Sequence, residues 1–148
     1  DNATLKAIAA SLHFDGWVIA DDSGLEVDAL GGAPGVYSAR YAGPGAQDAD
    51  NNALLLSNLA SVRGKDRSAR FRCVIVLARA GRKLAAFSGA VEGIIVPAQK
   101  GGGGFGYDPL FVPNGHCETF GQLPAAVKNQ LSHRAQALGK LRDWRGWW

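Results

Sequence analysis

The stretch WVIADDSGLEVD, residues 17–28, decides the fold class of this chain. Its first four residues form an unbroken apolar run, which is typical of a buried β-strand. Residues 25–28 alternate apolar and acidic side chains, as a strand does when one of its faces meets solvent. The residues between them, Asp21-Asp22-Ser23-Gly24, are types that favour a turn. The pattern predicts a short strand that ends at these four residues and an extended segment after them.

Helices are predicted on both sides of this stretch. Apolar residues spaced three and four apart in residues 5–12 indicate an amphipathic helix, which Gly16 ends. Asp48 is expected to cap a second helix that runs to about residue 62. Near the C-terminus, Pro124 suits the start of a short helix, and Ser132 suits the N-cap of a longer one that runs to about Trp144.

The remaining β-branched and aromatic runs predict further strands at residues 70–78 and 84–92, with shorter ones at 94–96 and 110–112. We expect all these elements to form one α/β domain over residues 1–148, in which helices surround a mixed β-sheet.

Composition excludes several classes of protein. The chain has 148 residues, of which 47% are hydrophobic and 20% charged, as in a compact globular domain. It contains no apolar run near the roughly 18 residues of a membrane span and no signal-peptide pattern, so we expect a cytoplasmic protein without a membrane partner. Its two cysteines are too few for a disulfide framework and lack the spacing of a zinc site.

Charge is distributed unevenly along the chain. Residues 1–50 carry eight acidic side chains against two basic ones, whereas residues 61–83 carry eight basic side chains against one acidic. This division can place an acidic metal site opposite a basic surface, although a solvated hairpin edge explains the basic stretch equally well. No recognition motif accompanies the basic residues, so no specific nucleic-acid partner is expected.

Asp21 and Asp22 are the first candidate for chemistry. Two carboxylates at a strand end can hold Mg²⁺ and deprotonate a water molecule, and Ser23 adds a hydroxyl group beside them. Gly24 would allow a ligand close to the backbone. An ordinary turn is the alternative reading of the same residues.

The glycine-rich tract at residues 101–106 is the second candidate. It matches the dinucleotide fingerprint formally, but Tyr107-Asp108-Pro109 follow where that fingerprint requires a helix. Phe105, Tyr107 and Asp108 instead suit a place where a flat ring stacks and an acceptor meets its edge. A flexible loop that packs its aromatic residues on the core remains the alternative.

Ser132-His133-Arg134 form the third candidate, because a helix start offers amide donors beside a guanidinium group and an imidazole. A basic helix start of this kind is also common without any function. A helix break at Ser132 would let Lys128 and His133 converge, since they would point about 140° apart on one continuous helix.

Taken in order, the stretch at residues 20–41, the sequence Gly103-Gly-Phe-Gly-Tyr-Asp-Pro109, and Lys128 with Ser132-His133-Arg134 resemble the inosine triphosphate pyrophosphatase family, also called the Ham1 family. The resemblance implies an elongated mixed β-sheet flanked by helices, in two lobes with a central cleft. It also implies a homodimer and Mg²⁺-dependent hydrolysis of ITP, dITP and XTP to the monophosphate and pyrophosphate.

The resemblance assigns a role to each candidate residue. Asp22 would activate water as a catalytic and metal-bound carboxylate, Asp21 would support the metal, and Ser23 would touch the substrate. Phe105 would stack on the purine in a pocket shaped by its neighbours, and a group of donors would read the 6-keto oxygen of the base. The pocket residues are Gly106, Tyr107 and Asp108, and the donors are Lys128, Ser132, His133 and Arg134.

One departure from the family pattern lies at the start of the chain. Family members open with a strand, a loop that grips the triphosphate, and a metal-binding Glu, none of which precedes Asn2 here. We therefore expect an N-terminally truncated member of the family. The alternative to a hydrolase is a non-catalytic relative that acts as a purine-nucleotide-binding or oligomeric module.

Overall fold

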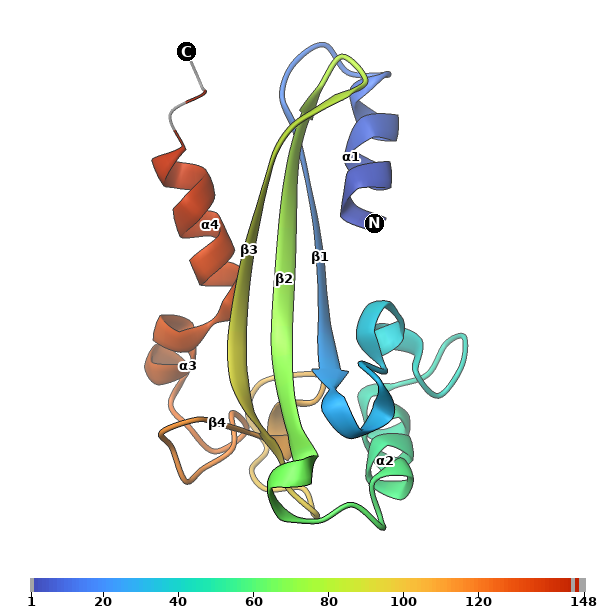
Figure 1. Cartoon of the computed structure of the whole chain (residues 1–148), viewed down its shortest axis with the longest axis vertical. Coiled ribbons are helices and arrows are strands. Elements are labelled where there is room, and N and C mark those ends of the chain that lie inside the picture. The colour runs from blue at the N-terminus through green and yellow to red at the C-terminus, as the bar shows by residue number, and fades with distance from the viewer. Residues whose placement is uncertain (1, 145, 147–148) are drawn as a thin grey trace. The chain divides into compact units, whose positions relative to one another are not determined.

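The computed structural model describes residues 2–144 and 146 (Figure 1). Four strands pair in the order β1-β2-β3-β4, and neighbouring strands run in opposite directions. Helices flank this sheet, which confirms the predicted α/β class. The strands are β1 (Val18–Val27), β2 (Ser68–Arg79), β3 (Arg82–Ile95) and β4 (Phe111–Pro113), and the α-helices are α1 (Asn2–Ser11), α2 (Asp48–Asn58), α3 (Ala125–Leu131) and α4 (His133–Asp143).

Two strands continue through residues at which the sequence pattern predicts a break. Strand β1 does not end at Asp21 but continues through the four turn-forming residues to Val27. Strand β3 likewise joins the two segments predicted at 84–92 and 94–96 into one. Both corrections have the same reason: hydrogen bonding to a neighbouring strand holds the backbone extended and overrides the local preference of Asp, Ser and Gly for turns.

The chain divides into two compact units, and β1, β2 and β3 each contribute residues to both of them. Unit 1 comprises residues 1–23, 72–90 and 132–148, and unit 2 comprises residues 24–71 and 91–131. The single domain predicted over residues 1–148 stays a prediction.

In unit 1, strand β2 is buried on both of its faces. Successive side chains of a strand point to opposite faces, so its apolar run divides into two sets. Cys73, Ile75 and Leu77 form a core with residues of α4, and Val74, Val76 and Ala78 pack with residues of α1. This arrangement explains why residues 73–78 are apolar without alternation.

Trp144, at the end of α4, packs on unit 1. Its ring meets those of Trp17 and Phe87 edge to face, with centroids 6.4 and 6.2 Å apart. Trp147 and Trp148 lie outside the described residues. Cys73 is a buried free thiol, and Cys117 is an exposed one.

The core of unit 2 is built around aromatic rings. Phe71 of β2 and Phe111 of β4 lie 4.7 Å apart between ring centroids, and Phe111 stacks on Phe120 at 5.4 Å. Strand β4 pairs antiparallel with the end of β3, and Gly93 stands opposite Pro113. A Cβ at Gly93 would lie 2.3 Å from the carbonyl oxygen of Val112, so only glycine fits in this register.

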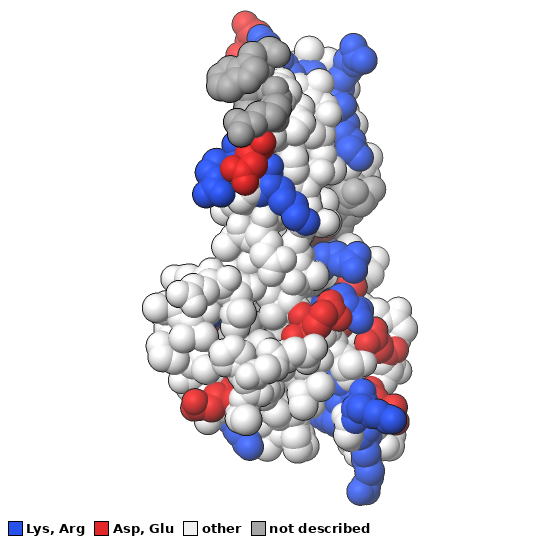
Figure 2. Space-filling model, turned by 60° about the vertical axis from the view of Figure 1, so that its left-hand side comes forward, with Lys and Arg blue, Asp and Glu red and all other residues white. Residues whose placement is uncertain are grey.

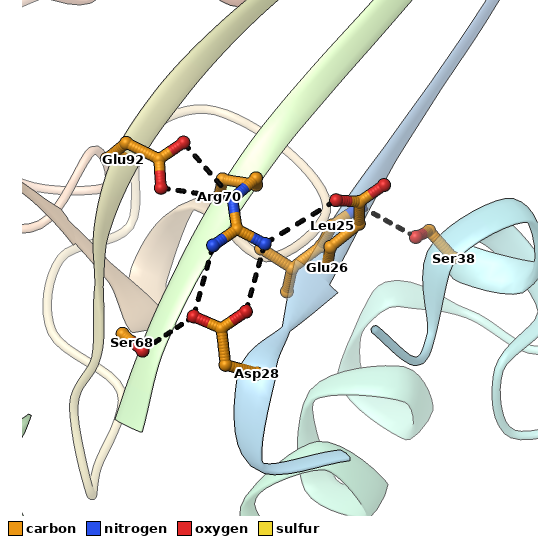
Figure 3. A network of polar contacts seen from close by, with 7 residues as sticks. All are labelled: Leu25, Glu26, Asp28, Ser38, Ser68, Arg70 and Glu92. Atoms are coloured by element: carbon orange, nitrogen blue, oxygen red, sulfur yellow. Dashed lines mark hydrogen bonds and ion pairs between the residues drawn. The ribbon is translucent and has the colours of Figure 1, made fainter. Parts of the chain in front are cut away.

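Arg70 links three strands of unit 2 through carboxylates (Figure 3). Its guanidinium nitrogens lie 3.0 Å from Asp28 of the short helix after β1 and 3.0 Å from Glu92 of β3, and 3.6 Å from Glu26 of β1. Ser68 also donates a hydrogen bond to Asp28 at 2.7 Å. These contacts stabilise the ionised carboxylate, so the hydrogen bonds from Arg70 and Ser68 lower the pKa of Asp28.

Charged side chains leave one part of the surface uncovered. Figure 2 brings forward the side of the molecule that carries α3 and β4, and much of the lower surface on this side carries no charge. The segment between Lys100 and Lys128 contains no lysine or arginine and only two acidic residues, of which Asp108 is buried.

In the described part of the chain, no helix has the length and apolar character needed to cross a membrane.

The Asp28 contacts predict a pH dependence of stability. Because the pKa of Asp28 is lowered in the folded state, its contribution is complete above the ordinary value of 3.8 and is lost as pH falls through the lowered pKa. Asp28→Asn should therefore lower the free energy of unfolding at pH 7, and this difference should shrink as pH falls below 3.8 and disappear below the lowered pKa of Asp28. Urea denaturation across this range, with Asp66→Asn as control for an exposed carboxylate, measures it; a difference that does not depend on pH would contradict the assignment.

Candidate active site

The break between the two C-terminal helices falls where the sequence predicts it. Helix α3 ends at Leu131, and α4 begins at His133 with Ser132 as its N-cap. The hydroxyl of Ser132 accepts a hydrogen bond from the backbone N–H of Ala135 at 3.3 Å. This bond uses the side chain of Ser132 to begin the helix.

Helix α4 approaches strand β3 closely at Gly89. A Cβ at Gly89 would lie 2.2 Å from the carbonyl oxygen of His133, so a larger residue would displace the start of the helix. Gln136 adds a second attachment, because its amide donates to the carbonyl of Ala90 at 3.0 Å and accepts from the N–H of Ala90 at 3.3 Å. Together these contacts position His133 and Arg134 in unit 1.

Arg134 contacts strand β1 directly. Its Nη2 lies 2.9 Å from a carboxylate oxygen of Asp21 and 3.3 Å from the hydroxyl of Ser23. Residues 21 and 23 share one face of a strand, so a single guanidinium group reaches both. On the same strand, the ammonium group of Lys6 in α1 donates to the backbone carbonyl of Asp21 at 2.7 Å.

The structure does not bring the carboxylates of Asp21 and Asp22 together. Consecutive residues of a strand point to opposite faces, so Asp22 faces away from Asp21 and Arg134. Asp22 is partly buried. Its carboxylate has no hydrogen bond or ion pair with another described residue. A turn at these residues, the alternative reading of the sequence, is wrong because all four belong to β1.

The donor set fits a divalent cation that is held mainly by the substrate. Among residues 2–144 and 146, no three His, Cys, Asp or Glu side chains gather in one place. Mg²⁺ commonly takes one or two carboxylates and completes its shell with water and substrate phosphates. Asp22 alone suits this mode, whereas Asp21 is occupied by Arg134.

In unit 2, the glycine tract is held tightly against a neighbouring segment. The N–H of Gly103 donates to the carbonyl of Gly121 at 2.9 Å, and a Cβ at Gly101 would lie 2.3 Å from the backbone of Gly121. Gly104 has a φ of +71°, and a Cβ there would lie 2.1 Å from the carboxylate of Asp108. These glycines therefore allow the tract to pack closely against Gly121 and Asp108.

The loop after this tract presents Phe105 to solvent. Its side chain is 72% exposed, and the ammonium nitrogen of Lys128 lies 4.3 Å from the ring centroid, in a cation–π contact. Lys128 also forms an ion pair with Asp108, and Asp108 accepts from the N–H of Phe105 at 3.0 Å. The exposed ring argues against the alternative in which this loop packs all its aromatic residues on the core.

Tyr107, unlike Phe105, packs on the core. It is 5% exposed, and its hydroxyl donates to the carbonyl of Ser38 at 2.6 Å. Burial raises the pKa of this phenol, with smaller contributions from Tyr41 and Asp48. The phenol is therefore neutral at physiological pH, and Tyr107 anchors the loop in the core of unit 2.

The predicted site residues thus divide between the two compact units, and the residues of each unit are called a cluster below, although Asp22 faces away from Asp21 and Arg134. Unit 1 holds the first, and unit 2 holds the second; the cleft expected between two lobes and the convergence of Lys128 with His133 stay predictions. The first cluster contains Asp21, Asp22, Ser23, Ser132, His133 and Arg134, and the second contains Phe105, Gly106, Tyr107, Asp108 and Lys128.

Sequence reasoning missed several residues that hold these clusters. Lys6 and Gln136 in unit 1 bond to backbone groups far away in the sequence, and no local motif marks either of them. In unit 2, Asp48 was expected to cap α2, but the N-cap is Gln47, and Asp48 instead accepts a hydrogen bond from the N–H of Gly106 at 2.8 Å. Its spacing of four from Asn52, which also bonds Gly106, is the one available signal.

Comparison with known proteins identifies the family of this chain and the class of its fold. The chain belongs to the Ham1 family, whose profile matches residues 1–144. The structure is similar to that of the Staphylococcus aureus Ham1 protein, with a TM-score of 0.90 and 45% identity over 95% of this chain and 72% of that one. A nucleoside-triphosphatase / dITP/XTP pyrophosphatase from Mycobacterium abscessus gives a TM-score of 0.86 and 42% identity over the same shares.

A curated relative is similar along nearly the whole chain. The dITP/XTP pyrophosphatase of Geobacter sulfurreducens is 50% identical over 147 residues, which are 99% of this chain and 74% of that protein. The dITP/XTP pyrophosphatase of Desulforamulus reducens is 52% identical over 97% of this chain and 71% of that protein. The predicted family is confirmed, whereas these matches do not support the expected N-terminal truncation.

The close approach at Gly89 yields a test of how α4 is positioned. Gly89→Ala should lower the free energy of unfolding by about 1–3 kcal/mol, because its methyl group has no space beside His133. Gly139→Ala is the matched control: its Cβ would meet only the end of Arg142 at 4.0 Å, and alanine favours the helix. Urea denaturation of both variants measures the effect, and equal stability would show that α4 does not depend on Gly89.

Proposed function

We propose that this chain hydrolyses the non-canonical purine nucleoside triphosphates ITP, dITP and XTP to the monophosphate and pyrophosphate. The names of the two curated relatives, both about half identical to it, support the reaction and the substrate class. The observation in the structure that carries the proposal is the ring of Phe105. It is exposed on a loop whose backbone is held in place, as a stacking platform for a flat base requires.

Each cluster, taken by itself, offers donors that suit recognition of a keto purine. Lys128 lies beside Phe105, and Asp108 holds its ammonium group in place. Arg134 uses Nη2 for Asp21 and Ser23, which leaves further guanidinium donors for a substrate. Such donors pair with the 6-keto oxygen of hypoxanthine or xanthine but face the 6-amino group of adenine without a partner.

Asp22 is the group assigned to the hydrolytic step. Its carboxylate would accept a proton from a water molecule as that water attacks the α-phosphorus, and the bond between this phosphorus and the bridging oxygen to the β-phosphate would break. Pyrophosphate then leaves with the electron pair of that bond. A divalent cation, Mg²⁺ in this proposal, would be held by Asp22 and the substrate phosphates and would neutralise the negative charge that develops on them.

The proposal extends to the setting in which the protein works. A nucleotide hydrolase of this kind would act on the cytoplasmic nucleotide pool, and the homodimer implied by the family is part of the proposal. Val36 and Tyr37, which are 55% and 58% exposed, are apolar surface residues that a second copy could cover. Sedimentation equilibrium would give the mass in solution.

Asp22→Asn tests the reaction. The change removes the proton acceptor and the charge but keeps the shape, so release of pyrophosphate from dITP with Mg²⁺ should fall by about 10²–10⁴-fold while the melting temperature stays close to that of the wild type. Asp15→Asn is the matched control, because Asp15 is an exposed acid of the same unit. Near-normal turnover by the Asp22 variant, or no turnover by the wild type, would refute the proposal.

Arg134→Ala tests recognition of the base. The variant should bind inosine monophosphate about 1–3 kcal/mol more weakly by calorimetry, because the keto oxygen loses its donor, whereas binding of adenosine monophosphate should change little. Arg142→Ala serves as control, since Arg142 lies on the same helix and pairs with its neighbour Asp143. Equal losses for the two nucleotides would exclude this role of Arg134.

A further inference from the structure

Helix α2 forms hydrogen bonds with both backbone groups of Gly106, the residue that follows Phe105. The carboxylate of Asp48 accepts from the N–H of Gly106 at 2.8 Å, and the amide of Asn52 donates to the carbonyl of Gly106 at 3.1 Å. Asp48 and Asn52 stand four residues apart, so they lie on one face of the helix. We propose that Asp48 and Asn52 are positioning residues that set the ring of Phe105 for stacking against a purine, an inference that rests on the proposed function.

Gly106 needs such a restraint because the other hydrogen bonds beside the ring join Phe105 to Asp108 and leave Gly106 itself unheld. Gly106 has a φ of +58°, a conformation that glycine enters and leaves easily, and a Cβ there would meet nothing within 4 Å. The side chain of Phe105 is largely in solvent and so gains little from packing. The two hydrogen bonds from α2 fix the peptide groups on either side of Gly106 and thereby restrict rotation about its φ and ψ angles.

Helix α2 is anchored independently of these two bonds. Asp50 accepts from the N–H of Gln47 at 3.0 Å and so caps the helix. Asn51 donates to the carbonyl of Ala39 at 3.1 Å and accepts from the N–H of Ala42 at 2.8 Å. We therefore expect that loss of the contacts to Gly106 leaves the helix in place.

Arg67 fixes the other end of α2. Its buried guanidinium group donates to the carbonyls of Leu59 and Val62 just after the helix, at 2.8 and 3.0 Å, and to that of Ile95 in β3 at 2.6 Å. Leu55 and Leu59 are also fully buried in the core of unit 2. The helix is thus a rigid support from which Asp48 and Asn52 reach the loop.

The burial of Asn52 is poorly suited to a purely stabilising role. The residue is 3% exposed, and its side-chain oxygen has no hydrogen-bond partner among the described residues. A buried acceptor without a partner costs stability, and an apolar side chain of similar size avoids that cost. The observed bond of its amide is the one to Gly106, so we expect Asn52→Leu to fold while it releases the loop.

Three variants separate positioning from stability. Asp48→Ala and Asn52→Leu each remove one bond to Gly106, and Asp50→Ala is the matched control that weakens the cap of the same helix without touching the loop. Binding of inosine monophosphate and of ribose 5-phosphate, which lacks the base, is measured by calorimetry. Hydrogen exchange of the Gly106 amide is measured by NMR.

We expect both loop variants to bind inosine monophosphate about tenfold more weakly and ribose 5-phosphate unchanged. The amide of Gly106 should exchange faster in Asp48→Ala, and Asp48→Asn, which keeps an acceptor oxygen, should restore most of the binding. Asp50→Ala should lower the melting temperature but keep the affinity for inosine monophosphate.

Unchanged affinity for inosine monophosphate in both loop variants, or equal losses for the two ligands, would overturn the positioning role. Failure of the wild type to bind inosine monophosphate would instead refute the proposed function, and the exchange of Gly106 would show separately whether α2 restrains the loop. If Asp48→Ala does not fold, Asn52→Leu and Asp48→Asn decide the question on the same measurements.

Discussion

The burial of strand β2 on both faces is the constraint on which the rest of the structure depends. Among the described residues, its side chains enter all three hydrophobic cores: Ala69 and Phe71 in unit 2, and the alternating apolar side chains of residues 73–78 in unit 1. A strand without a solvent face needs cover on each side, so α1 and α4 both pack on it in unit 1. Arg70 is a charged residue within this strand, and its three carboxylate partners lie on the segments beside it.

Glycines, which have no Cβ, let backbone segments pack closely beside the candidate site residues. A Cβ at Gly24 would lie 2.3 Å from the carbonyl of Gly35, so the loop after β1 folds back onto the strand there. The sequence suggested that Gly24 admits a ligand, and the structure shows that the chain itself occupies that space. Gly89 gives α4 the same freedom beside β3. Glycine at these positions thus serves close packing, and the positions of Arg134 and of the neighbouring loops follow from it.

Both clusters of candidate residues place a flexible cation beside a carboxylate. Arg134 pairs with Asp21 at an exposed position, and Lys128 pairs with the buried Asp108. Exposed pairs contribute little to stability, so the value of the first lies in the orientation of the guanidinium group. The second pair is less exposed and brings the ammonium group over the ring of Phe105. Holding donors in place before a ligand arrives lowers the cost of ordering them when it binds.

Local chemistry in the sequence determined the α/β class, the family and the helix break at Ser132. Each depends on neighbours along the chain: an apolar run, an N-cap, or a short motif. Only the tertiary structure decided that β1 continues through Asp21 and Asp22, which separates their carboxylates. It also decided that Asp48 bonds Gly106, which is 58 positions away, and that Gln136 bonds Ala90 across 46. Such contacts depend on how distant segments pack, and hydrogen bonds between them override the preferences of the residues that they join.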